Sequence, residues 1–302
     1  MIHIVDAENS GLRVDKYITV KLGEGYSRTY VRFLMDNGCV SVNGKAVKMH
    51  YALHEGDEVE ARLLDPPGVD DVEPENIPLD ILYEDEWIVV VNKPAGMVVH
   101  PGAGNKNGTL VSALLYHCGS LPETDNKLRP GIVHRLDKDT SGVIVAAKNA
   151  KALRSLSKQF QNRTVKKRYI ALVKGCVQMD NGCIEAPLAR HAEDRKKVEV
   201  DHANGKAART VYHVIRRSDK FTLLRLEPET GRTHQIRVHM KHIGHPVLGD
   251  VTYGGKDGKM ARQALHAESL GFTHPGTGKY VEFTIPMPED IRKVAEALDD
   301  SR

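Results

Sequence analysis

A dense group of ionisable and polar side chains lies in the string HRLDKDTSG, residues 134–142, which holds two carboxylates, two cations, a histidine and two hydroxyls. A Pro-Gly pair at residues 130–131 precedes the string, and an apolar run from Val143 to Ala147 follows it, which predicts a turn and then a buried strand. Side chains that do chemistry are often carried on loops held by a rigid strand. A carboxylate in such a loop can attack an electron-poor carbon or take a proton. We therefore expect a reaction centre at this loop rather than a solvated surface.

The elements that must position this loop are predicted between residue 81 and residue 302. Apolar runs of strand length recur there, and two stretches show helical spacing of their apolar residues. The predicted strands are Trp87–Val91, Tyr169–Val173, Ala208–Ile215, Phe221–Leu226 and Tyr280–Ile285, and the predicted helices are residues 150–161 and 234–243. Several strands with few helices and no regular strand–helix alternation favour an α+β fold with a largely antiparallel, mixed sheet.

A smaller unit is predicted before residue 65. Its expected elements are a helix over Arg13–Leu22, a helix over Arg28–Asp36 with Ser27 as its N-cap, a hairpin around the Asn43-Gly44 turn and a strand over Glu58–Ala61. Together they predict a small N-terminal α/β domain at residues 11–64.

The bulk composition is that of an ordinary globular protein. Of the 302 residues, 27% are charged and 40% are hydrophobic, and no apolar run approaches the roughly 20 residues of a membrane helix. Residues 1–10 lack the basic and apolar regions of a signal peptide. The four cysteines show no C-x-x-C spacing, so neither zinc nor a disulfide framework is indicated. We expect a cytoplasmic protein with reduced thiols, no metal and no membrane contact.

The net charge of +3 hides an asymmetry along the chain. Residues 1–80 hold 8 Lys or Arg and 15 Asp or Glu, whereas residues 81–302 hold 35 and 25. No basic residue lies between Arg62 and Lys93, and residues 65–80 are rich in proline and acidic side chains, which predicts an extended linker. The basic balance of the larger part is compatible with a polyanionic partner and, equally, with a merely solvated surface.

The string at residues 134–142 resembles H-R-L-D-x-x-T-S-G, the signature of the RluA-type pseudouridine synthases, in which the Asp is catalytic; that residue is Asp137 here. Three further strings are similar to motifs of the same family. They are NKPAG at residues 92–96, KKRY at residues 166–169 and TGRTHQIRVH at residues 230–239. The resemblance implies a pseudouridine synthase fold over residues 81–302, with Tyr169 as the active-site tyrosine and Arg237 lying against Asp137.

The implied reaction isomerises uridine: the glycosidic bond breaks, the base turns, and a ring carbon replaces the nitrogen in the link to the sugar. Because nothing is oxidised and no group is donated, the resemblance implies no cofactor and no metal. The reaction needs a carboxylate that stays ionised beside a developing cationic sugar, and a neighbouring Arg favours the ionised form. Spacing alone leaves a second interpretation open, a structural ion pair between Asp137 and Arg237.

A uridine inside folded RNA must be extruded before it reacts, at a cost of about a few kcal/mol in lost stacking. The resemblance implies that Tyr169 stacks on the flipped base and relays a proton through its hydroxyl, and that Arg135 fills the gap left in the RNA. From spacing alone, Tyr169 is a half-buried strand aromatic and Arg135 is a loop cation.

The segment from Ser27 to Lys45 resembles the small RNA-binding module with the alpha-L motif, named after a ribosomal protein of the small subunit. In that module the basic second helix and the hairpin bind folded RNA through its phosphates and its shape. The resemblance makes four cations candidate phosphate contacts, and they are Arg28, Arg32, Lys45 and Lys48. From spacing alone, Arg28 and Arg32 are exposed residues on one helix face.

A metal-dependent hydrolase is a rival interpretation of the third motif. Its candidate ligands are His234, His239, His242 and His245. No carboxylate or cysteine stands at a ligand spacing among these histidines, and Gly244 and Pro246 end the predicted helix there. We therefore favour the RNA-modifying interpretation.

A non-catalytic RNA-binding or ribosome-assembly factor is the second rival, but it would lack part of the reactive set, and Asp137, Tyr169 and Arg237 are all present. A small RNA-binding domain on an acidic, proline-rich tether resembles the branch of the family that modifies large-subunit ribosomal RNA more than the short members that modify transfer RNA. We expect a monomeric enzyme that acts on structured RNA, either large-subunit ribosomal RNA or an assembling ribosomal subunit, with transfer RNA as the alternative.

Overall fold

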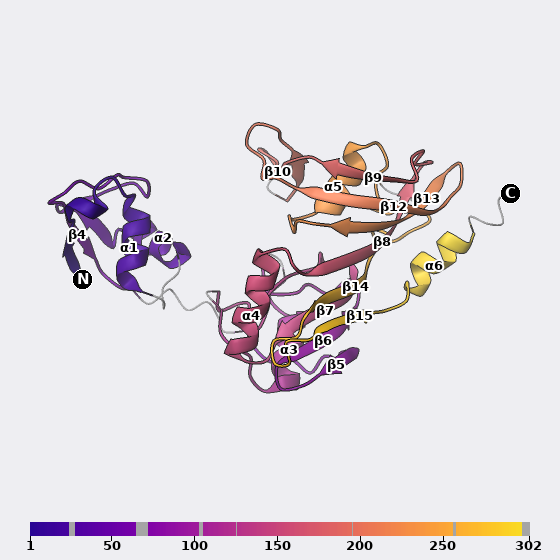
Figure 1. Ribbon diagram of the computed structural model, residues 1–302, viewed down its shortest axis with the longest axis horizontal. Helices are drawn as coiled ribbons and strands as arrows, with labels where there is room; N and C mark the ends of the chain where they lie inside the picture. The colour runs from indigo at the N-terminus through magenta and orange to yellow at the C-terminus, as the bar shows by residue number, and fades with distance from the viewer. Residues whose placement is uncertain are drawn as a thin grey trace. The chain divides into compact units, whose positions relative to one another are not determined.

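The computed structural model describes residues 1–23, 28–64, 72–102, 105–124, 126–194, 196–255 and 258–297, the side chains of residues 28 and 29 excepted. The chain divides into two compact units (Figure 1). They consist of Met1–Asp71 with Asp125–Lys127, and of Val72–Thr124 with Leu128–Arg302.

The second unit begins earlier than the sequence predicts. Of the expected linker at residues 65–80, residues 65–71 lie outside the described part of the chain, whereas residues 72–80 belong to the second unit. Asn92 donates to Asp80 twice, through its backbone N–H at 2.8 Å and through its side-chain amide at 2.9 Å. These bonds attach the end of the acidic, proline-rich segment to the second unit, so this part is not a free tether.

The first unit combines two helices with a four-stranded antiparallel sheet of order β1-β4-β2-β3. Its elements are β1 (Ile2–Ile4), η1 (Ala7–Asn9), α1 (Val14–Leu22), α2 (Arg28–Asp36), β2 (Val40–Val42), β3 (Lys45–Ala46) and β4 (Glu58–Ala61). The predicted helices, hairpin and last strand are confirmed, while Ser27 lies outside the described residues. Strand β1 was not predicted, and because it pairs with β4 the unit begins ahead of residue 11.

The helices and the sheet of the first unit share one apolar core. Val31 and Leu34 of α2 are buried in the same cluster as Val40 and Val59 of the sheet. The apolar stripe of α2 therefore faces the core, and Arg32 and Asp36 are exposed at the surface.

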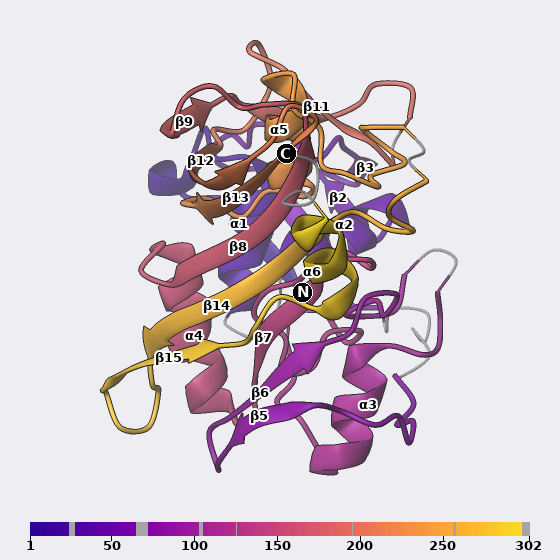
Figure 2. The ribbon, with the colours of Figure 1, turned by 90° about the vertical axis from the view of Figure 1, so that its right-hand side faces the viewer.

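The second unit is built on one large mixed sheet (Figures 1 and 2). Its strands are β5 (Ile81–Glu84), β6 (Ile88–Lys93), β7 (Ser141–Ala147), β8 (Lys166–Lys174), β9 (Asn181–Glu185), β12 (Arg209–Arg217), β13 (Phe221–Pro228), β14 (Leu265–Thr273) and β15 (Tyr280–Thr284). A separate two-stranded hairpin consists of β10 (Leu188–Arg190) and β11 (Val198–Val200). The helices are α3 (Leu110–Cys118), α4 (Ala150–Gln161), α5 (Gln235–His242) and α6 (Glu289–Glu296).

The strand order is β5-β6-β7-β14-β8-β13-β12-β9, with β15 also paired to β14. Among the described strands of this sheet, β7 and β14 form a parallel pair and all other pairs are antiparallel. The expected α+β fold with a largely antiparallel, mixed sheet is confirmed.

Strand β7, which follows the HRLDKDTSG loop, is buried on both faces. Successive side chains of a strand point to opposite faces. Val145 accordingly packs in one cluster with Leu156 of α4, while Ile144 packs in another with Leu114 of α3. The loop is therefore anchored to a strand whose seven residues are all buried.

Strand β14 brings the distant motifs together. It pairs with β7 on one side and with β8 on the other. Helix α5 packs through Ile236 and Met240 against Leu224 and Leu226 of β13, the strand beyond β8. The loop before β7, the strand β8 and the start of α5 consequently converge on one region of the sheet.

Candidate active site

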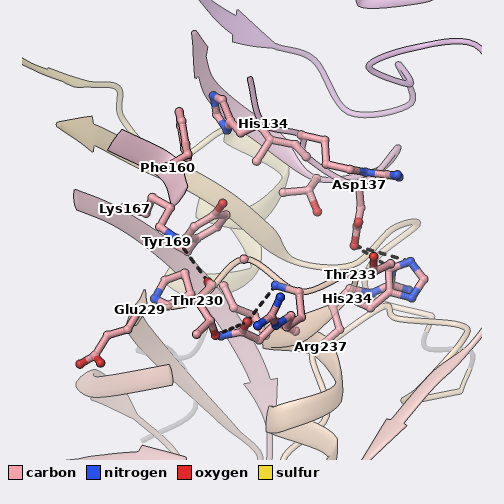
Figure 3. A pocket seen from close by; sticks show the side chains of 18 of the residues that line it. His134, Asp137, Phe160, Lys167, Tyr169, Glu229, Thr230, Thr233, His234 and Arg237 are labelled. Atoms are coloured by element: carbon pink, nitrogen blue, oxygen red, sulfur yellow. Dashed lines mark hydrogen bonds and ion pairs between the residues drawn. The ribbon is translucent and has the colours of Figure 1, made fainter. Parts of the chain in front are cut away.

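A pocket of about 470 Å³ lies between the loop before β7, strand β8 and the segment that joins β13 to α5 (Figure 3). Four sequence-predicted residues line it: Arg135, Asp137, Tyr169 and Arg237. They converge because β7, β14 and β8 are neighbours in the sheet. A second hollow of about 400 Å³ adjoins the pocket, since Arg135, Asp137 and Arg237 line both.

The loop that carries Asp137 is attached to strand β6 by Lys93. The ammonium of Lys93 is fully buried and donates to the carbonyls of Pro94 at 2.7 Å, Met97 at 2.8 Å and Lys138 at 3.0 Å. Burial lowers the pKa of Lys93 to about 7. Three carbonyl acceptors match the three N–H groups of an ammonium, however, and this geometry favours the charged form. The NKPAG motif thus supports the Asp137 loop, a role that spacing did not reveal.

Arg237 binds two carboxylates at once. Its Nη1 donates to Oδ2 of Asp137 at 3.0 Å, while Nε and Nη2 donate to Oδ2 and Oδ1 of Asp250 at 2.7 and 2.9 Å. Asp250 is fully buried and also accepts from the backbone N–H groups of Thr252 and Tyr253. Burial opposes the charge of Arg237, but the bonds to Asp250 and Asp137 outweigh it and raise the pKa of Arg237. Sequence reasoning missed Asp250, because only the fold brings it to Arg237.

The two oxygens of Asp137 have different surroundings. Oδ2 lies 3.0 Å from Nη1 of Arg237 and 3.9 Å from Nε2 of His234. Within the described part of the chain, Oδ1 has no hydrogen-bond partner. One oxygen is therefore held by a cation, and the other is available to a substrate.

Tyr169 lies on β8 and points into the same pocket as Asp137 (Figure 3). Burial, with a smaller contribution from the negative charge of Asp137, raises the pKa of Tyr169. The phenol consequently keeps its proton at neutral pH. It can donate a hydrogen bond and present an aromatic face, but it is not a base.

His234 begins helix α5 in an unusual backbone conformation. Its φ of 54° and ψ of 18° are left-handed, which costs a residue with a side chain on the order of 1–2 kcal/mol. Its Nδ1 lies 2.8 Å from the hydroxyl of Tyr253, whose ring is 5.1 Å from the guanidinium of Arg237. The predicted helix is confirmed, with His234 as its first flanking residue.

Further cations surround the pocket. Arg163, Lys167 and Arg232 line it together with the residues already named. Nζ of Lys167 donates to the Thr230 carbonyl at 3.3 Å, and burial, followed by the charge of Arg163, lowers the pKa of Lys167 to about 8. Concentrated positive charge at a concave site attracts anions.

The predicted phosphate-binding cations of the first unit lie on helix α2, on strand β3 and just after β3. Arg32 on α2, Lys45 on β3 and Lys48 are exposed. Arg32 lies 3.6 Å from the carboxylate of Asp36, an exposed pair that contributes little to stability. The side chain of Arg28 lies outside the described residues.

The histidines of the rival metal site make other contacts. Nδ1 of His239 lies 2.9 Å from Oγ1 of Thr210, and its Nε2 lies 3.0 Å from the carbonyl of Ala186. Nδ1 of His245 lies 2.9 Å from the carbonyl of Lys174. These rings therefore serve packing and hydrogen bonding within the fold rather than a shared metal.

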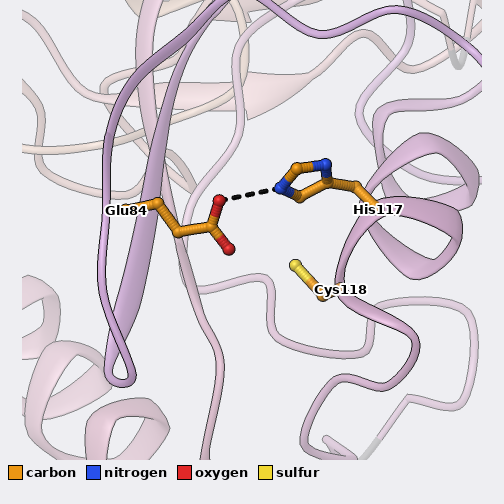
Figure 4. Close-up of side chains that lie close together, drawn as sticks. All are labelled: Glu84, His117 and Cys118. Carbon is orange, nitrogen blue, oxygen red and sulfur yellow. Dashed lines mark hydrogen bonds and ion pairs between the residues drawn. The ribbon is translucent and has the colours of Figure 1, made fainter.

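One other group of described residues offers three ligand atoms within 4.8 Å of one another: Glu84, His117 and Cys118 (Figure 4). The Glu84 carboxylate is already paired with Lys148 at 2.5 Å and with Nε2 of His117 at 2.7 Å. The group belongs to β5 and α3, which lie at the opposite end of the unit from α5 (Figures 1 and 2). Ion pairing accounts for this arrangement, and it takes no part in the pocket.

Residues 87–242 match the family model described as RNA pseudouridylate synthase, and residues 12–59 match the S4 domain. The chain belongs to the RluA family of RNA pseudouridine synthases. It is an isomerase with an N-terminal S4 RNA-binding domain, as the sequence motifs predict. No helix in the described ranges combines the length and the apolar character needed to cross a membrane.

Relatives of this synthase match it over nearly its whole length. YlyB, an uncharacterized RNA pseudouridine synthase of Bacillus subtilis (strain 168), is 48% identical over 292 residues, which are 96% of this chain and 95% of that protein. The ribosomal large subunit pseudouridine synthase D of Pasteurella multocida (strain Pm70) is 42% identical over 306 residues, which are 95% of this chain and 91% of that protein. The solved structure of human RNA Pseudouridylate Synthase Domain Containing 1 matches with a TM-score of 0.57 and 27% identity, over 79% of this chain and 98% of that one.

Proposed function

We propose that this synthase isomerises uridines in large-subunit ribosomal RNA and that Asp137 is its catalytic carboxylate. The observation that carries the assignment of Asp137 is its 3.0 Å ion pair with Arg237 inside the pocket that Tyr169 also lines. A carboxylate held by a buried cation, with one oxygen open to the pocket, is the arrangement that stabilises or attacks a developing positive charge.

The proposed reaction uses each of these groups at a stated atom. The flipped uracil stacks on the ring of Tyr169, and Oδ1 of Asp137 faces the ribose, where it attacks C1′ or takes a proton from the sugar. The N1–C1′ bond breaks as Oδ1 forms an ester bond to C1′ or takes the sugar proton. After the base has turned, the C5–C1′ bond forms as the ester bond breaks or as the proton returns to the sugar. The proton that leaves C5 is balanced by one that N1 gains. Arg237 holds the carboxylate in position for this reaction.

The remaining cations are assigned to the RNA chain. Arg135 is exposed at the mouth of the pocket, where it occupies the gap that the flipped uridine leaves in the RNA. Arg32, Lys45 and Lys48 of the S4 domain bind phosphates, and Arg28 completes this set. Contacts of this kind provide affinity without reading the sequence.

Large-subunit ribosomal RNA is favoured over transfer RNA by two observations. The chain carries an S4 domain in addition to the catalytic unit. It also matches relatives named ribosomal large subunit pseudouridine synthase D over more than nine-tenths of its length. We propose that the enzyme acts as a monomer in the cytoplasm, on the RNA or on an assembling subunit, without a cofactor or a metal.

The test is a map of pseudouridines in total RNA from cells with and without the gene. Large-subunit sites should disappear without the gene, return with the wild-type gene, and stay absent with the Asp137→Asn variant. Loss confined to transfer RNA would overturn the substrate and leave the mechanism standing. Return of the sites with the Asn variant would overturn the role of Asp137.

A further inference from the structure

His234 stands where the two hollows around Asp137 meet. It lines both of them, as do Asp137 and Arg237. Its Nε2 lies 3.9 Å from Oδ2 of Asp137, on the same oxygen that Arg237 binds. The ring is only 18% exposed, so little water competes for that nitrogen.

The backbone holds this ring in place at a conformational cost. His234 is one of three non-glycine residues with a positive φ in the described part of the chain. Strained residues persist where the surrounding structure determines them, and such residues cluster at functional sites. The residue held in this conformation has its imidazole Nε2 3.9 Å from Oδ2 of Asp137.

The hydrogen bonds of Tyr253 determine which nitrogen of His234 carries the proton. The hydroxyl oxygen of Tyr253 accepts from the backbone N–H of Val198 at 2.9 Å. Its single proton faces Nδ1 of His234 at 2.8 Å, the one other hydrogen-bond partner of this hydroxyl among the described residues. With this proton donated to Nδ1, the neutral ring carries its own proton on Nε2, the nitrogen that faces Asp137.

The charges around the ring agree with a neutral imidazole. Burial lowers the pKa of His234, and Arg237 and Arg135 act in the same direction, while Asp137 and Asp250 act against it. Burial also raises the pKa of Tyr253, so its hydroxyl keeps the proton that it donates.

We propose that His234 is a positioning residue of the reaction centre: held by Tyr253 as the Nε2–H tautomer, it donates to Oδ2 of Asp137 and, with Arg237, keeps Oδ1 turned toward the ribose. The inference rests on the proposed role of Asp137. The 3.9 Å separation shortens to a hydrogen bond when RNA closes the site, as catalytic hydrogen bonds do on formation of the reactive complex.

The first test reads the tautomer without any assay of activity. In protein labelled with ¹⁵N-histidine, correlation spectra assigned with the His234→Gln variant should show Nδ1 of His234 without a proton and Nε2 with one. Tyr253→Phe keeps the ring beside Arg237 but removes the hydroxyl, and it should convert His234 to a mixture of tautomers or to the imidazolium. A proton on Nδ1 in the wild-type protein would refute the inference.

The second test is a double-mutant cycle on single-turnover rates, measured with RNA that the wild-type enzyme modifies. His234→Leu should lower the rate by about 10- to 100-fold with RNA affinity nearly unchanged, and His234→Gln, whose amide Nε2 can donate to Asp137, should lose less. Tyr253→Phe should slow the wild type but have little further effect in the His234→Gln background. The control His242→Gln, an exposed histidine on the same helix, should leave the rate unchanged.

Different outcomes of these experiments would refute the role of His234 and the proposed role of Asp137. Equal effects of Tyr253→Phe in both backgrounds, or full activity of His234→Leu, would overturn the role of His234 alone. Full activity of Asp137→Asn would overturn the proposed reaction centre, whatever the His234 variants do.

Discussion

The Nη1 atom of Arg237 lies 3.0 Å from Oδ2 of Asp137, although the two residues are 100 positions apart in the sequence. The same guanidinium is bound on its other edge by the fully buried Asp250. Because Asp250 fixes Arg237, the position of Asp137 depends on a buried ion pair as much as on its own loop. Variants of Asp137, Arg237 and Asp250 separate these contributions.

Replacing Asp137 by Asn keeps the size of the side chain and removes its charge. Pseudouridine formation should fall by about 10³-fold or more, since the variant cannot attack or take a proton. RNA affinity should change little, because phosphate contacts dominate it. Asp180→Asn makes the same chemical change at an exposed carboxylate and should retain full activity. Substantial activity of Asp137→Asn on the true substrate would rule out the assignment.

Replacing Arg237 by Leu removes the cation beside Asp137. Oδ2 of Asp137 then loses the partner that holds it at 3.0 Å, so activity should drop. Arg237→Lys should rescue poorly, because one ammonium cannot reproduce the three bonds to two carboxylates. Normal turnover of Arg237→Leu would show that the pair is structural only.

Replacing Asp250 by Asn tests the buried half of the same arrangement. The change leaves Arg237 buried with less counter-charge and should lower the free energy of unfolding by about 3 kcal/mol. Activity at a temperature where the variant stays folded should also fall, because Arg237 loses its orientation. Denaturant unfolding and single-turnover rates measure the two effects separately. A stable variant with wild-type turnover would contradict the prediction.

The cation of Lys167 should make RNA binding depend on pH. Its pKa of about 8 means that the ammonium is present below that pH and is lost above it. Between about pH 7 and about pH 9, the affinity for RNA should therefore fall. The slope of the logarithm of affinity against the logarithm of salt concentration should shrink by about 1, the value for one phosphate contact. Lys167→Arg stays charged and should remove this pH dependence. An identical pH response in both proteins would exclude Lys167 as the titrating group.

Deleting residues 1–70 removes the S4 domain and leaves every catalytic motif in place. The Michaelis constant should rise by about 10- to 100-fold, because the S4 domain no longer raises the effective concentration of RNA at the pocket. The single-turnover rate at saturating RNA should stay close to that of the full chain. A slowed chemical step at saturation would show that the first unit also shapes the active site.

The sequence by itself determined the family and the fold class, and it supplied the residues that are proposed as the reactive set. These properties come from local sequence. The nine-residue string at residues 134–142, the amphipathic helix at residues 150–161 and the apolar run Val143–Ala147 can each be recognised without knowing which distant residues they contact. The side chains of β7 pack alternately into two apolar clusters, and Asn149 caps α4, so the local pattern and the final packing agree.

Elements with ambiguous patterns were missed for a physical reason. Helix α3 is an almost continuous apolar run, which periodicity cannot distinguish from a strand, and it is buried under β6 and β7. Strand β14 carries the buried polar His266, which bonds to Ser141 of the neighbouring strand and interrupts the apolar alternation. The hydrogen bond to Ser141 explains why the polar side chain of His266 is tolerated at this buried position, and the sequence alone does not reveal this bond.

The tertiary structure alone decided how the reactive groups are held. Lys93 becomes a buried ammonium on three carbonyls, Asp250 becomes the second partner of Arg237, and the Tyr253 hydroxyl comes within 2.8 Å of Nδ1 of His234. None of these roles is visible in spacing, because each depends on a partner supplied by another segment and on the burial that packing creates. Hydrogen bonds and ion pairs of this kind are strong because little water reaches them, and this burial is present only after the chain has folded.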